Sequence, residues 1–241
     1  MTSVQPGTRQ DRRKARTRGA ILAAAEEFFA AAGPEAATIA SIADAADVAV
    51  ATVYKHFAGK DDLYLAVAER ALEHNERHMF AVYGSGLPPA EKLIDAAAAY
   101  LSFYLESPRL FRLIALRQGT PTDESSAGPV AVMLSERVDR MTQALAGVIE
   151  QGVADGSLRA VLPLDTARFL WGAMNGAIAL AQRPDRLRLT EAELRSALLQ
   201  GTEILLAGLL AEPLRGPDGL APRLRDRLHA LIGSNHSGRP E

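Results

Sequence analysis

Residues 38–60 read TIASIADAADVAVATVYKHFAGK, a stretch that predicts two short helices joined by a tight turn. Thr38 is a preferred N-cap residue, and apolar residues follow it three and four positions apart, as a buried helical stripe requires. This inward stripe consists of Ile39, Ile42, Ala43 and Ala46. The chain then turns at Asp47, one of the few residues other than glycine that tolerate a left-handed backbone. We therefore expect a helix-turn-helix.

The second short helix places its polar residues on one side. Val53 and Phe57 are spaced to face inward. The outward set is Val50, Ala51, Thr52, Tyr54, Lys55 and His56. Hydroxyls, a cation, a ring nitrogen and small apolar groups can reach phosphates, base edges and thymine methyl groups in a major groove. The pattern predicts that this helix reads DNA, whereas an isolated pattern of this kind is also compatible with an ordinary solvated helical hairpin.

Charge favours the DNA-reading alternative. Residues 1–25 carry six basic side chains and one acidic one, although the whole chain has a net charge of -2. Residues 1–60 have a net charge of +2, which leaves -4 for the remainder. Positive charge is therefore concentrated at the predicted reading head, where it suits a polyanion.

These features together resemble the tetracycline-repressor-like (TetR) family of transcription regulators. The resemblance rests on the basic segment, the stripe Ile21, Leu22, Ala25, Phe28 and Phe29, the cap Thr38, the run from Thr52 to Phe57, and Gly59-Lys-Asp-Asp-Leu63. It covers about residues 12–70, and Asp47 departs from the glycine usual in the family. The residues that we expect to contact DNA are Arg12, Arg13, Lys14, Arg16, Thr38, Ser41, Val50, Ala51, Thr52, Tyr54, Lys55, His56 and Lys60.

The 241 residues suffice for a small head and one larger domain, both all-α. We expect a flexible basic arm (1–14), a three-helix DNA-binding head (15–60), a helical ligand-binding and dimerisation domain (61–211), and a Pro/Gly/Arg-rich tail (212–241) with at most one short helix near residues 222–231. Cysteine is absent, which excludes a disulfide framework and thiolate metal sites. No secretory segment opens the chain and no apolar run is long enough to span a membrane, so we expect a cytoplasmic protein.

Residues 169–181 form a run of thirteen residues without a charge. A helix that is apolar all round must be buried on two sides, and Gly172 and Gly176 would let another helix approach closely. We expect a homodimer in which this helix and the next pair with the same helices of a second copy. The predicted interface residues are Phe169, Gly172, Gly176, Leu198, Gly201 and Leu205. Burial of both helices within the monomer is the alternative.

In the resembled family the larger domain holds a small-molecule pocket. Candidate lining residues here are aromatic, sulfur-containing or amide side chains with few charges among them, which favours a small apolar or aromatic effector. They are Tyr100, Phe103, Tyr104, Phe111, Met141, Trp171, Met174 and Asn175. Aromatic and methionine side chains at helical spacing are also typical of a plain hydrophobic core.

Enzyme patterns are weak in this chain. His74 and His78 lie four residues apart, a spacing fit for zinc, but the order is not HExxH and no third ligand is evident, so solvated surface histidines are the simpler interpretation. Gly59-Lys60 lacks the other residues of a phosphate-binding loop. We expect no catalytic residues, no metal and no cofactor.

The sequence thus predicts a dimeric repressor that binds a near-palindromic DNA operator and is released by a small effector. Two alternatives belong to other classes. One is a sequence-tolerant DNA-packaging or scaffold protein that uses the same basic segment. The other is a metal-dependent enzyme built on His74 and His78.

Overall fold

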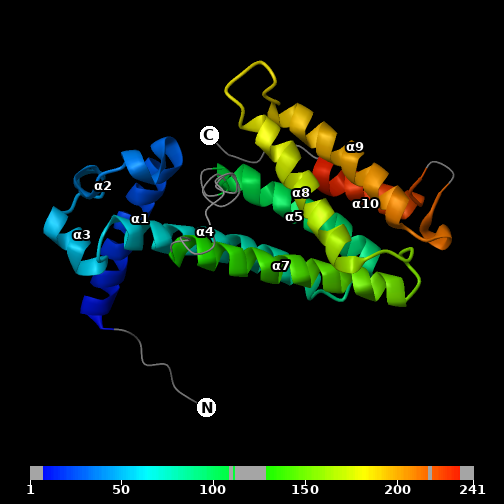
Figure 1. The fold of residues 1–241 in the computed structure, drawn as a ribbon, viewed down its shortest axis with the longest axis horizontal. Coiled ribbons are helices and arrows are strands. Elements are labelled where there is room, and N and C mark those ends of the chain that lie inside the picture. The colour runs from blue at the N-terminus through cyan, green and yellow to red at the C-terminus, as the bar shows by residue number, and fades with distance from the viewer. Residues whose placement is uncertain (1–7, 109–110, 112–128, 217–218, 234–241) are drawn as a thin grey trace, which may run out of the picture. The chain divides into compact units, whose positions relative to one another are not determined.

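The computed structural model describes residues 8–108, 111, 129–216 and 219–233, and these are almost entirely helical, as predicted (Figure 1). They form two compact units. One comprises residues 1–73 with 107–134, and the other comprises residues 74–106 with 135–241. Helices α4 (Lys60–Tyr83) and α7 (Pro129–Ala154) contribute to both units. The units therefore divide inside α4 and α7.

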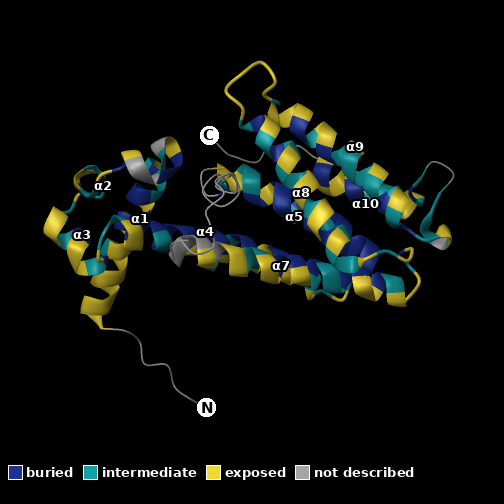
Figure 2. Cartoon of the chain, viewed as in Figure 1, coloured by how far each residue is buried: buried dark blue, intermediate teal, exposed yellow. Residues whose placement is uncertain are grey.

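The first unit is built around three helices, α1 (Arg9–Ala36), α2 (Ile39–Ala45) and α3 (Val50–His56), and the N-terminal part of α4. Helix α2 packs against both α1 and α3. The side chains that form the core are almost fully buried (Figure 2). They include Ile21, Ala25, Phe29, Ile42, Val53, Phe57, Leu63 and Val67. The rings of Phe29 and Tyr64 meet edge to face at 5.2 Å and tie α1 to α4.

The basic segment is more ordered than expected. We predicted a flexible arm over residues 1–14, but α1 already begins at Arg9. The physical reason is a capping box, in which Thr8 accepts a hydrogen bond from the Asp11 N–H and the Asp11 carboxylate accepts one from the Thr8 N–H. Residues 9–14 are therefore the first turns of a helix, and the helix sets the spacing of the basic residues along the backbone.

The second unit contains α5 (Pro89–Glu106), α8 (Pro163–Ala181) and α9 (Glu191–Leu209), followed by the short helices η3 (Glu212–Leu214), α10 (Pro222–Leu228) and η4 (His229–Gly233). Helix α8 carries proline in its first turn, where no intrahelical hydrogen bond is lost. Helix α9 begins with a capping box between Thr190 and Glu193. Helices α8 and α9 pack against each other, and α5 packs against α9 and α10.

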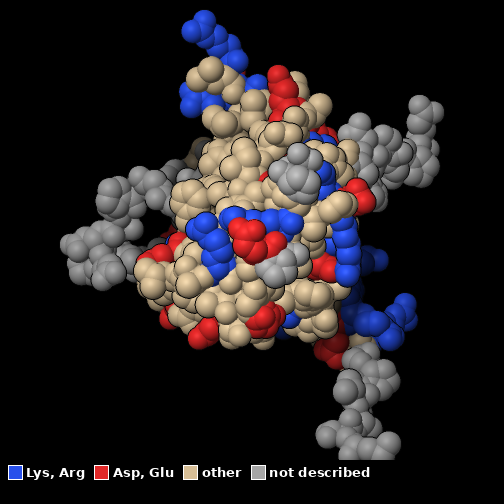
Figure 3. Space-filling view, turned by 90° about the vertical axis from the view of Figure 1, so that its right-hand side faces the viewer, with Lys and Arg blue, Asp and Glu red and all other residues tan. Residues whose placement is uncertain are grey.

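The segment expected to form a tail contributes to this core instead. Leu224 and Leu228 of α10 are at most 5% exposed, and so are Leu220 and Ile232 beside it. The guanidinium of Arg227 donates two hydrogen bonds, of 2.7 and 2.6 Å, to the Asp95 carboxylate on α5. Figure 3 shows basic and acidic side chains next to each other on the face that it presents. The arginines of this segment therefore act at least partly as ion-pair partners that dock α10 on α5.

Among the described helices, none is both long enough and apolar enough to cross a membrane.

Candidate DNA-binding surface and ligand pocket

The turn between α2 and α3 has the geometry that the sequence predicts. Thr38 caps α2, since its hydroxyl accepts from the Ser41 N–H at 3.1 Å while the Ser41 hydroxyl accepts from the Thr38 N–H at 3.3 Å. Asp47 is the only described residue other than glycine with a positive φ, 52°. This left-handed residue reverses the chain direction before α3. Val53 and Phe57 are 0% and 2% exposed, so α3 is anchored by one face.

In the described part of the chain, the opposite face of α3 is exposed. Tyr54 is 56% exposed and Val50 is 41% exposed, an unusual degree for large apolar side chains. None of the thirteen residues that we predicted to contact DNA is buried; each is exposed or half-buried. Arg18 of α1 stacks its guanidinium 4.9 Å from the centre of the Phe57 ring. Helix α1 therefore brings its cations next to the end of α3.

His56 lies near two of those cations. Partial burial lowers the pKa of its imidazole, and the nearby charges of Lys14 and Arg18 lower it further. Lys14 and Arg18 thus lie near His56 and place positive charge at this edge of the unit. Such convergence is the electrostatic requirement for binding a phosphate backbone.

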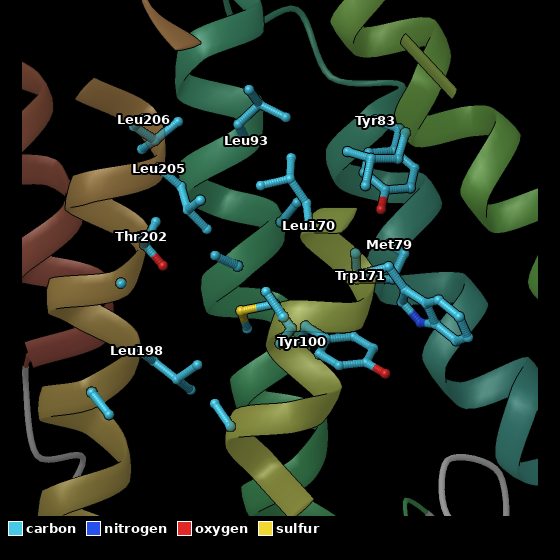
Figure 4. A pocket seen from close by; sticks show the side chains of 18 residues that line it. Met79, Tyr83, Leu93, Tyr100, Leu170, Trp171, Leu198, Thr202, Leu205 and Leu206 are labelled. Carbon is cyan, nitrogen blue, oxygen red and sulfur yellow. The ribbon is translucent and has the colours of Figure 1, made fainter. Parts of the chain in front are cut away.

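A pocket of about 140 Å³ lies within the second unit, between α4, α5, α7, α8 and α9. Figure 4 shows the labelled side chains of α9 on one side and Met79 and Tyr83 of α4 on the other. No charged side chain is among the lining residues. The polar groups offered by the lining side chains are the hydroxyls of Tyr83, Tyr100 and Thr202 and the indole N–H of Trp171. The lining suits an apolar group with few hydrogen-bonding atoms.

Only part of the predicted lining set lies at this pocket. Tyr100, Trp171 and Met174 line it, whereas Phe103, Tyr104, Phe111, Met141 and Asn175 are not among its lining residues. Phe103 and Phe111 are each 1% exposed and belong to the core. The sequence reasoning missed every contribution of α4 and α9. These residues are Met79, Tyr83, Ala197, Leu198, Gly201, Thr202, Leu205 and Leu206. Their apolar spacing indicated a buried face but not which neighbour that face would meet.

Asn175 supports the pocket wall from behind. Its side-chain oxygen accepts a 2.9 Å hydrogen bond from the Tyr100 hydroxyl, and its amide nitrogen donates at 3.0 Å to the Trp171 carbonyl. Burial raises the pKa of Tyr100, so the phenol stays protonated and remains a donor. The pair fixes the orientation of Tyr100 between α5 and α8.

Among the described residues, the outer face of α8 and α9 is largely apolar and exposed. Phe169 is 63% exposed and Ile204 is 69% exposed, and both line a shallow groove between the two helices. A Cβ added at Gly172, Gly176 or Gly208 would meet nothing within 4 Å. Leu198 differs from the other predicted interface residues, because it is 4% exposed and lines the pocket. Gly201 and Leu205 also line the pocket and are half-buried.

His74 and His78 have a neighbour that the sequence did not reveal. Glu106, the last residue of α5, places a carboxylate oxygen 3.8 Å from Nε2 of His74. Burial, and then the proximity of His78 and Arg77, lowers the pKa of His74 and keeps its imidazole neutral near pH 7, although the Glu106 carboxylate acts in the opposite direction. No local pattern in the sequence indicates this proximity, which arises from the packing of α4 beside α5.

The first unit thus contains a helix-turn-helix, and the second is a helical unit with an apolar pocket. Residues 21–67 match the family described as bacterial regulatory proteins, tetR family, and residues 93–201 match the tetracyclin repressor-like C-terminal domain. The chain belongs to the tetR family.

Individual relatives agree with this assignment. The chain is 33% identical over 97 residues to the HTH-type transcriptional activator FasR of Mycolicibacterium smegmatis, a match that spans 40% of this chain and 44% of FasR. It resembles the solved structure of FadR from Bacillus subtilis in complex with stearoyl-CoA, with a TM-score of 0.65, 20% identity and coverage of 79% and 98%. AibR in complex with isovaleryl coenzyme A and operator DNA gives a TM-score of 0.65, 19% identity and coverage of 79% and 98%. At these identities the two structures establish a shared fold.

Proposed function

We propose that this protein is a homodimeric transcriptional repressor that binds a near-palindromic operator in the cytoplasm and is released by a small ligand with an apolar or acyl portion. The observation that carries the proposal is the outer face of α3. Large and polar side chains of this helix are exposed on an anchored scaffold, and the cations of α1 converge beside them. Two such helices, about one helical turn of DNA apart, would enter successive major grooves.

The surface of α8 and α9 supports the proposal of a homodimer. An isologous interface needs one self-complementary patch, and this patch is apolar, includes exposed Phe169 and Ile204, and contains glycines whose Cβ positions are empty. Glycine at an exposed helix position lowers the stability of a monomer. These glycines are therefore better explained by the close approach of a second helix. We place the second copy on this face.

The pocket supports the proposal of a small ligand. Its uncharged lining of methionine, tyrosine, tryptophan, leucine and alanine fits an acyl chain or an aromatic ring. The similar structures of FadR and AibR were solved with acyl-CoA molecules, which makes such compounds the first probes to use. Helix α4 can couple ligand binding to DNA binding. Met79 and Tyr83 of this helix line the pocket, whereas Leu63 and Val67 of the same helix are buried in the first unit. A ligand that favours one position of α4 changes operator affinity by its preference for that state.

The first experiment is a titration of specific and random DNA duplexes at several salt concentrations. A repressor should bind its operator at least about a thousandfold more tightly than random DNA. A packaging protein would show equal affinities for both duplexes, and that result would overturn the proposal. A reporter gene placed behind the operator then gives the sign of regulation, since expression should rise when this protein is deleted.

A second experiment tests the pocket with a matched pair of variants. Gly201→Phe places a ring in the pocket, whereas Gly201→Ala adds one methyl group with no atom within 4 Å of its Cβ. Stearoyl-CoA should release the wild type and Gly201→Ala from the operator, and Gly201→Phe should stay bound. Equal release of both variants would show that the ligand acts elsewhere.

A further inference from the structure

Two imidazoles and one carboxylate meet on the second unit where α4 and α5 lie side by side. His74 and His78 are one turn apart on α4, and Glu106 ends α5. One potential ligand atom from each of the three residues lies within 4.8 Å of the other two. Among the described residues, this is the one group of at least three histidine, aspartate or glutamate side chains with such a spacing.

The hydrogen bonding of His78 suits a metal ligand. Its Nδ1 lies 2.9 Å from the carbonyl oxygen of His74. A carbonyl oxygen only accepts, so Nδ1 carries the proton, and in the neutral ring Nε2 then keeps its lone pair. Metal-binding histidines commonly donate their second ring N–H to a backbone carbonyl in this way, which fixes the tautomer and the ring orientation.

His74 is held in place but lacks a hydrogen bond. Its ring packs 5.7 Å from the fully buried ring of Phe103 and 4.8 Å from the ring of His78. Its Nε2 is buried and has no hydrogen-bond partner among the described residues, because the Glu106 oxygen at 3.8 Å is too far away. A buried polar atom without a partner is costly, and a bound cation would satisfy it.

The chemistry of the three side chains indicates which metal ions would bind. Two imidazoles and a carboxylate are typical zinc ligands at about 2.0–2.2 Å, which requires the ligand atoms to lie within about 4 Å of one another. His78 and Glu106 are exposed, so side-chain rotation can close the present spread of 4.8 Å. Magnesium and calcium prefer all-oxygen ligand sets and fit poorly.

We propose that His74, His78 and Glu106 bind one divalent transition-metal ion of the zinc class, with a fourth position left to water. The ion ties the end of α5 to the middle of α4, the helix that contributes to both compact units. This site is separate from the apolar pocket, since none of its three residues lines that pocket. The proposal does not depend on operator binding and holds for the protein whatever its effector.

The test uses full-length protein without a histidine tag, stripped with a chelator and titrated with zinc in competition with a chromophoric chelator. We expect one zinc ion per chain. His78→Gln and Glu106→Gln should each weaken zinc binding at least tenfold, and both side chains are exposed, so the fold should survive, as circular dichroism can verify. His229→Gln removes an exposed histidine on η4 and should leave zinc binding unchanged.

Cobalt gives a second readout that nonspecific binding would not produce. A low-symmetry site of two imidazoles, one carboxylate and water should give Co²⁺ intense visible absorption bands, and these should disappear in His78→Gln and Glu106→Gln. The proposal is overturned if the wild type takes up no stoichiometric zinc, or if both variants bind zinc as tightly as the wild type does.

Discussion

The hydroxyl of Tyr100 on α5 donates a 2.9 Å hydrogen bond to the side-chain oxygen of Asn175 on α8, at the wall of the uncharged pocket. Asn175 is itself held by the Trp171 carbonyl. The two residues therefore present the Tyr100 ring to the cavity in a fixed orientation while the polar atoms satisfy each other behind it.

Replacing Tyr100 by phenylalanine should lower the free energy of unfolding by about 1 to 3 kcal/mol, because the Asn175 oxygen loses its partner inside the protein. Urea denaturation followed by circular dichroism measures the change. Tyr54→Phe is the matched control, since the Tyr54 side chain is 56% exposed and its hydroxyl can bond to water. Equal effects of the two substitutions would show that the Tyr100 hydrogen bond does not stabilise the fold.

The cations of α1 and the face of α3 should affect DNA binding in different ways. Arg12→Gln combined with Arg13→Gln should reduce the slope of log affinity against log salt by about 2 if both side chains contact phosphates, with little change in sequence preference. Tyr54→Ala should cost about 1 to 3 kcal/mol on the operator and reduce the preference for it over random DNA. Fluorescence anisotropy on both duplexes separates the two effects. Arg186→Gln, in an exposed loop of the second unit, should change neither.

The left-handed turn at Asp47 can be tested by stability alone. At a φ of 52° glycine pays no steric cost, whereas a β-branched residue is strongly disfavoured. Asp47→Gly should change the free energy of unfolding by less than about 1 kcal/mol, and Asp47→Val should lower it by about 1 to 2 kcal/mol. Thermal unfolding of the two variants side by side gives the comparison. A stable valine variant would mean that the turn adopts another conformation.

His56 should make stability depend on pH. Burial, Lys14 and Arg18 lower its pKa in the folded state, so the folded protein binds this proton less readily than the unfolded chain does. The stabilising contribution of neutral His56 is present above the unfolded pKa of about 6.5 and is lost as the pH falls below it. Between pH 7.5 and 5.5 the wild type should therefore lose more stability than His56→Gln. The measurement is the free energy of unfolding of both proteins as a function of pH, and equal slopes would refute the prediction.

The local elements of this fold could be predicted from the sequence, because their determinants lie within a few residues. Thr38 caps α2, Asp47 reverses the chain, and Thr190 with Glu193 starts α9, each through contacts with neighbours in the sequence. The start of α1 was missed although Thr8 and Asp11 have capping-box spacing, because the basic composition favoured the interpretation as an arm.

The tertiary relationships could not be predicted in this way. Nothing in the sequence places Glu106 beside His74 or sets Leu198 of α9 opposite α4, because an apolar or polar face specifies burial and not its partner. Leu224 and Leu228, four residues apart, did signal a buried helical face in α10. The short helix was therefore expected, but its docking was not, because the acidic partners of Arg223 and Arg227 lie on α5, 132 residues away in the sequence.

The dimer face on α8 and α9 offers the sharpest remaining test of assembly. Phe169 and Ile204 are 63% and 69% exposed in this chain, so replacing either by glutamate should leave the monomer fold intact. Because an isologous interface uses the same patch of both copies, each substitution would bury two charges without partners. The protein should therefore shift from dimer to monomer. Analytical ultracentrifugation measures the shift, and the monomer should bind operator DNA far more weakly. Leu187→Glu is the control, because Leu187 is 58% exposed in the loop before α9. A dimer that persists in the Phe169 and Ile204 variants would place the interface on another surface.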